Sequence, residues 1–181
     1  MGRASIRQAA YNYFTNAGIP NLGTVFAARP FVVNEDDYDT SMAAGLIQYI
    51  TSSSGSSGIM IVNISESGRR RNELTGFGAV GDFTVHQMEL EVFFANTAGD
   101  AIAAQTDHDT TMDSIVIAIR ADPTLGTSGT PGTIFGAGVF QNVPITVHQG
   151  SPFWDPDGTT VFIPSIVRLE AWEHPSGPAG V

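Results

Sequence analysis

The alternation of apolar and polar side chains is clearest between Thr84 and Phe94, where it predicts a half-buried strand. The apolar positions lie on one face of that strand: Met88, Leu90, Val92 and Phe94. The polar positions lie on the other face: Gln87, Glu89 and Glu91.

After a break at residues 96–100, the spacing changes to that of a helix beginning at Ala101, with Asp100 as its N-cap. We expect one stripe to face the core: Ile102, Gln105, Met112, Ile115, Val116 and Ile119. The helix should end near Ala121, because Pro123 pushes Asp122 out of helical geometry and Gly126 suits a turn.

A second amphipathic helix is predicted over residues 4–17, ended by Gly18 and Pro20. A strand with one apolar face and helices with one apolar stripe form a two-layer core. The predicted fold class is therefore α+β, a mixed or mainly antiparallel sheet packed by an N-terminal helix and one long central helix.

Further strands are predicted at 24–28, extended by Phe31–Val33, and at 59–64, which is apolar on both sides and therefore central. Others follow near 134–140, at 143–147 and at 161–172, where Pro164 indicates an edge strand or a bulge. A short helix is expected at 42–50. The acidic residues before it are Glu35, Asp36, Asp37 and Asp39, which complement its dipole.

The remaining stretches are expected to be irregular parts of a single domain, 1–181. They are a flexible Ser/Gly surface loop at 51–58, a long exposed arm or hairpin at 65–82 and an irregular tail at 174–181.

Composition narrows the function classes. The 181 residues contain no cysteine, which excludes disulfides and thiolate chemistry, and the formal net charge of −10 disfavours binding to nucleic acid backbones. No apolar run reaches the roughly 18 residues of a membrane helix, and the first residues lack the apolar region of a secretory signal peptide.

No motif indicates an enzyme, and we expect no cofactor and no metal. Residues 76–81 match G-x-G-x-x-G, but a strand rather than a helix is predicted after them. Asp107, His108 and Asp109 are adjacent, so they diverge around a helix, and Asp113 adds only a second carboxylate on the face of Asp109. Asp155-Pro156-Asp157-Gly158 predicts a tight turn.

The basic cluster Arg69-Arg70-Arg71 has two interpretations. It is either a solvated surface or a contact with an acidic partner surface.

Several segments together resemble the tail terminator proteins of long-tailed phages that infect actinobacteria. They are Ile6–Phe14 with Ala17–Phe26, the strand carrying His86, Leu90, Glu91, Val92 and Phe94, the helix end Ile119–Gly126, and Arg168–Glu173. Loop 51–58 and arm 65–82 have no counterpart in this resemblance.

The resemblance implies a structural virion protein, made in the host cytoplasm, that forms a homohexameric ring. Such a ring caps the head-proximal end of the tail tube and stops its polymerisation. Its partners are the tail tube protein and the head-completion or stopper protein, while phage DNA passes through the lumen without specific binding. The candidate subunit, neck or tube contacts are Arg69, Arg70 and Arg71.

Two other readings stay open. The first is another tail or neck component, either the tube subunit, which polymerises without limit, or the stopper. The second is a small intracellular enzyme or ligand-binding module, for which a pocket with converging polar groups would be needed.

Overall fold

A computed structural model of the chain describes residues 3–28, 56–72, 81–127, 134–137 and 145–173. The helices and strands run in this order: α1 (Arg3–Asn16), β1 (Leu22–Phe26), β2 (Ser56–Asn72), β3 (Gly81–Asn96), α3 (Ala101–Ala121), β4 (Ile134–Ala137), β5 (Thr146–Gln149), β6 (Phe153–Trp154) and β7 (Val161–Glu173).

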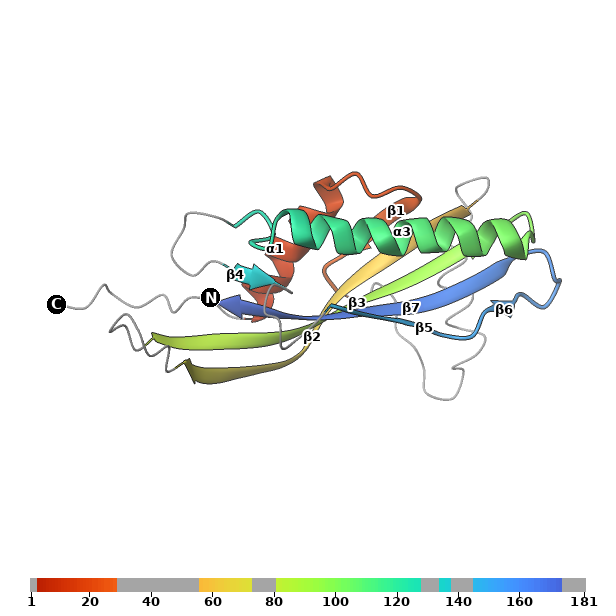
Figure 1. The fold of residues 1–181 in the computed structure, drawn as a ribbon. Helices are drawn as coiled ribbons and strands as arrows, with labels where there is room; N and C mark the ends of the chain where they lie inside the picture. The colour runs from red at the N-terminus through yellow and green to blue at the C-terminus, as the bar shows by residue number, and fades with distance from the viewer. Residues whose placement is uncertain (1–2, 29–55, 73–80, 128–133, 138–144, 174–181) are drawn as a thin grey trace.

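The strands form one mixed sheet in the order β1-β2-β3-β7-β4, and β5 and β6 also pair with β7. β1 runs parallel to β2, and the other pairings are antiparallel. In Figure 1, α3 lies along the sheet with α1 beside it, so both helices belong to one layer. The predicted α+β class is confirmed. The strand at 59–64 lies within β2 and has described neighbours on both sides only as far as Ile61.

The main core fills the space between this helix layer and the sheet. It takes apolar side chains from both helices and from three neighbouring strands: Ile6, Ala10 and Phe14 of α1, Met112, Ile115 and Ile119 of α3, and Met60, Val62, Ile64, Met88, Leu90, Val92, Val167, Leu169 and Ala171 of the sheet. The apolar face predicted for residues 88–94 is thus the buried face of β3.

The predicted stripe of α3 is wrong in part. Ile102 is 82% exposed, whereas His108 and Thr111 are buried. The buried positions follow 104, 108, 111, 115 and 119, which share one face at 100° per residue. Ile102 and Val116 lie off that face, so hydrophobicity alone misplaced the stripe.

The expectation that Pro164 marks an edge or a bulge is also wrong. β7 is an interior strand, and its register with β3 is continuous through Phe93 and Pro164. The backbone amide of Gly150 donates to the carbonyl of Pro164 at 2.8 Å. The N and C=O groups of one strand residue point to the same side of the strand. The nitrogen of Pro164, which has no hydrogen to donate, therefore faces the gap between β5 and β6, where no paired strand requires a donor.

Part of the Ser/Gly segment is strand rather than flexible loop, because residues 56–58 begin β2. Gly58 is buried, donates its N–H to Asn21 O at 2.7 Å, and a Cβ there would lie 3.2 Å from the Phe94 ring. The predictions for 31–39, 42–50, 51–55, 139–144 and 174–181 concern residues outside the described ranges.

Both ends of α3 have an aspartate cap, of which the N-cap Asp100 was predicted and the C-cap Asp122 was not. Asp100 Oδ1 accepts from the amides of Ile102 and Ala103, each at 3.0 Å. After the helix, Asp122 accepts from Thr124 N–H, Thr124 Oγ1–H and Gly126 N–H. Within the described residues, no helix is both long and apolar enough to span a membrane.

The Asp122 turn predicts a pH-dependent contribution to stability. The hydrogen bond from the Thr124 hydroxyl, followed by those from the Gly126 and Thr124 amides, lowers the pKa of Asp122 below its ordinary value. A lowered folded-state pKa gives stability that is present above the unfolded pKa near 4 and lost as pH falls through the folded pKa.

We expect Asp122→Ala to lower the free energy of unfolding at pH 7 by about 1 kcal/mol, because two amides and a hydroxyl lose their acceptor. Urea titrations at pH 7 and at pH 3 should show a smaller difference between wild type and variant at pH 3. Asp113→Ala, an exposed aspartate of the same helix, is the control. An equal difference at both pH values would contradict the role of the ionised carboxylate.

Candidate interaction surfaces

The predicted arm is formed by the ends of β2 and β3. Their antiparallel register continues to Asn72 opposite Gly81, with Arg69, Arg70 and Arg71 opposite Thr84, Phe83 and Asp82. β7 reaches only Thr84, through Glu173. The arm consists of residues 65–72 with 81–87, and its outer part, 70–72 with 81–83, extends past the end of β7 as a two-stranded ribbon. Figure 1 shows it at the side of the molecule where α3 ends.

The base of this arm is tied to the N-terminus of α1. Arg3 Nε donates to Ser67 Oγ at 3.0 Å, and Ser67 Oγ lies 2.8 Å from Nδ1 of the buried His86. The register of β2 with β3 shifts between Ile64 and Glu66, at the same level. A bulge increases the local twist of a ribbon, and this one lies where the arm turns away from the sheet. The contact of Arg3 with Ser67 fixes the arm at that point.

A second arginine of α1, Arg7, lies beside the outer edge of β2. β1 accompanies β2 only as far as Phe26 opposite Ile61. Beyond that point a hollow of about 120 Å³ is lined by Arg7, Ala28, Ile61, Val62 and Asn63. The Nε of Arg7 is buried and has no hydrogen-bond acceptor among the described residues. A buried donor without an acceptor lowers the stability of a protein by about 1–3 kcal/mol. An acceptor that reached Arg7 Nε at this edge would therefore bind favourably.

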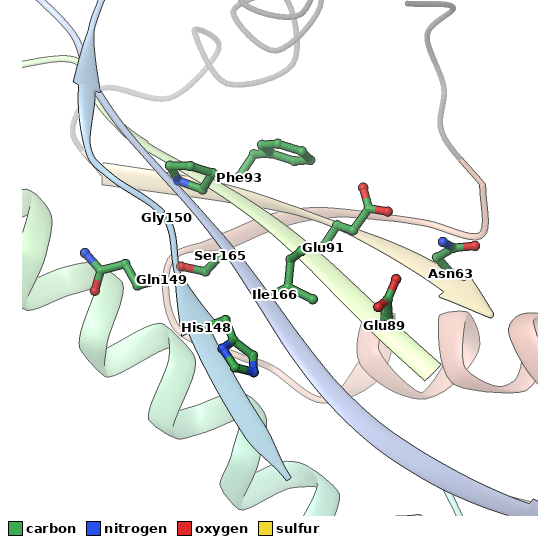
Figure 2. A pocket seen from close by; sticks show the side chains of 10 residues that line it. Asn63, Glu89, Glu91, Phe93, His148, Gln149, Gly150, Ser165 and Ile166 are labelled. Atoms are coloured by element: carbon green, nitrogen blue, oxygen red, sulfur yellow. The ribbon is translucent and has the colours of Figure 1, made fainter. Parts of the chain in front are cut away.

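The sheet face opposite the helices is mixed, with a row of polar side chains beside apolar ones such as Phe93 and Ile166. Asn63, Glu89 and Arg168 lie directly across three strands, and Arg168 Nε pairs with Glu89 Oε1 at 2.9 Å. Figure 2 shows Glu89, Glu91 and Asn63 around a hollow of about 500 Å³, with His148 on β5 at its margin.

Two further carboxylates on this face are buried. Glu170 Oε1 accepts from Gln87 Nε2 at 2.6 Å and its Oε2 from Trp172 Nε1 at 3.3 Å, while Glu91 lies one strand away. Since Glu91 and Glu170 are buried and Glu89 pairs with Arg168, these carboxylates are held by contacts within the protein and are not displayed as an acidic surface.

A contact that spacing did not reveal joins α3 to β7. His108 is 1% exposed, its Nδ1 lies 3.0 Å from Asp109 Oδ1, and its Nε2 lies 2.8 Å from Ser165 Oγ. Because a carboxylate only accepts, Nδ1 carries a proton toward Asp109, and Nε2 forms the hydrogen bond with the Ser165 hydroxyl. The Phe94 ring meets the imidazole edge-on, at 5.9 Å between centroids.

This Asp-His-Ser arrangement has the residue types of a hydrolytic triad but not its access. Ser165 is 3% exposed and lies beneath α3, so no substrate carbonyl reaches its hydroxyl. The described residues contain no group of three His, Asp or Glu side chains placed to hold a metal ion. The sequence singled out His108 only as a metal candidate, and its partner Ser165 is far away in the chain.

The glycines of the G-x-G-x-x-G match lie mostly outside the described residues, but Gly81 begins strand β3. The helix that the dinucleotide motif requires is therefore absent at this place. The turn predicted at 155–158 is confirmed, with Gly158 N–H donating to Asp155 O at 3.0 Å. Amides of Thr160 and Thr159 bond to the Asp155 carboxylate and lower its pKa.

Large apolar side chains are exposed on two other surfaces. Ile102 (82%) and Ile117 (63%) lie on the outer side of α3, and Phe153 (40%) and Trp154 (46%) form β6 at the end of the sheet. Exposed aromatic side chains at the margin of a fold are typical of protein contacts.

No protein-family model matches the chain, and no curated protein matches it. Among solved structures, one match is a chain of the "Virion of native gene transfer agent (GTA) particle". It is 10% identical, with a TM-score of 0.41, over 94% of this chain and 95% of that chain. A likeness at this level shows neither a family nor a function.

We predict that Ser165→Ala destabilises the fold by about 1–3 kcal/mol, because it leaves the buried Nε2 of His108 without its hydrogen-bond partner. The control is Ser114→Ala on α3, the helix that carries His108. The Ser114 hydroxyl donates to Thr110 O, and the stability of this variant should stay within about 0.5 kcal/mol of wild type. Urea unfolding followed by circular dichroism measures both variants. Equal stabilities would show that the contact between His108 and Ser165 contributes nothing.

Proposed function

We propose that this chain is a structural virion protein, a tail terminator whose ring caps the head-proximal end of the tail tube. The ring stops tube polymerisation and joins the tail to the head or neck. Its homohexameric state follows from the family resemblance.

The observation that carries this proposal is the place of the resembling segments. They are far apart in the sequence, yet α1, β3, the end of α3 and β7 all contribute to one core. The resembling segments are therefore packing residues of this chain, which supports a resemblance that extends over the fold rather than a short motif.

The described surfaces support an assembling protein over a catalyst. The contact between Ser165 and His108 is buried, which suits a packing role rather than a reaction centre. Contact with another protein would remove the exposed apolar side chains of α3 and β6 from water, which is favourable.

In the proposed ring, Arg69, Arg70 and Arg71 contact acidic groups on a neighbouring subunit or on the neck or tube. Their place on a ribbon that extends past β7 supports this role, because an extension reaches a neighbour more readily than the body of the sheet does. The high negative charge of the rest of the chain favours such local pairs of opposite charge.

The test is negative-stain imaging of the purified protein, alone and mixed with tail tube fragments. We expect tubes capped at one end by a single disc, whose rotational symmetry gives the copy number. Long tubes formed by the protein alone would favour a tube subunit. Particles that ignore tube ends would contradict the terminator.

The variant Arg69→Glu/Arg70→Glu/Arg71→Glu should lose capping, or the later joining to heads, while keeping wild-type thermal stability. Arg120→Glu, a reversal on the last turn of α3, is the control and should cap normally. Infectious virions of normal yield assembled from the triple variant would show that the arginine cluster is not a contact.

A further inference from the structure

We propose that the outer edge of β2, from Val62 to Asn72, binds an extended acidic segment of another protein by strand addition. This goes beyond the proposed function, since it holds for a terminator, a stopper or any other assembling role. It adds two arginines of α1 to the cluster on the arm and states how the partner binds.

The first argument is the free edge. β1 leaves β2 after Ile61, so from Val62 onward β2 pairs with β3 alone among the described residues. A strand has N–H and C=O groups along both sides, and half of those of this stretch point away from β3. Unpaired edges of this length are templates for an added strand unless they are blocked.

The second argument is charge. Five of the eight basic residues of the chain lie along this one edge: Arg3 and Arg7 on α1, and Arg69, Arg70 and Arg71 on β2 itself. The chain as a whole carries a formal charge of −10. A basic strip on an acidic protein selects an acidic partner and repels a basic one.

The third argument is Arg7. Its buried Nε lacks an acceptor, and the hollow of about 120 Å³ beside it opens at the point where β1 ends. An added strand that continues alongside Val62 and Asn63 enters this hollow. A carboxylate on that strand supplies the acceptor that Arg7 lacks, and the Asn63 amide offers a further donor.

The described strands at the sheet margins are not the source of the added strand. β1, β4, β5 and β6 contain no aspartate or glutamate. None of them offers the charge that the edge selects. Nucleic acid has the charge but not the backbone amides and carbonyls that a strand edge pairs with.

The experiment uses the full-length protein and a capped probe peptide that alternates glutamate with threonine or valine. Two control peptides have lysine in place of glutamate, or alternate N-methylated amides that cannot pair as a strand. Amide exchange and chemical-shift mapping by NMR at millimolar peptide report where each probe binds. We expect new protection at alternate residues of Val62–Asn72 with the acidic probe only.

Arg7→Gln should weaken binding of the acidic probe on the order of tenfold. Arg120→Gln, the same exchange on α3, should leave the affinity unchanged, and circular dichroism checks that both variants fold.

Four outcomes overturn the proposal: no shift along β2 at millimolar peptide, equal binding of the lysine or N-methylated probe, equal binding of a thymidine oligonucleotide, or self-association that depends on Arg7. None of these bears on tube capping, so a failure here is distinct from a failure of the proposed function.

Discussion

Burial of one face of β3 under the two helices is the contact on which the other features depend. Met88, Leu90 and Val92 are completely or nearly completely buried between α1 and α3 on one side and the neighbouring strands on the other. This face fixes the register of β2 and β7, because a shift by one residue would turn every side chain of a strand to the opposite face. The polar row across the other face follows from that same register.

The sequence identified this centre but not its margins. The period-2 spacing of β3 and the residues that end α3 are local signals, so both could be predicted from the sequence. The stripe of α3 was misplaced because His108 and Thr111, both polar, occupy core positions through partners elsewhere in the chain: Ser165 for the first, and Pro20 O for the second, 3.1 Å from the Thr111 hydroxyl. Pairings of this kind carry no spacing signal, so hydrophobicity cannot predict them.

The edges of the sheet were the hardest features to predict. Pro164 suggested an edge strand, yet β7 has neighbours on both sides, and the proline fits because β5 and β6 leave a gap at its level. The arm was predicted as an exposed arm or hairpin. No feature of the sequence indicated that it is the continuation of β2. Arg7 gave no signal either, because a helix arginine ordinarily points into solvent.

The distribution of charge connects the fold to its use. Salt screens an exposed charge beyond about 8–10 Å, so a net charge alone neither brings two proteins together nor holds them apart at contact distance. What matters at contact is where the few cations lie. Placing arginines along one strand edge and on the ribbon that continues it confines attraction to a narrow line.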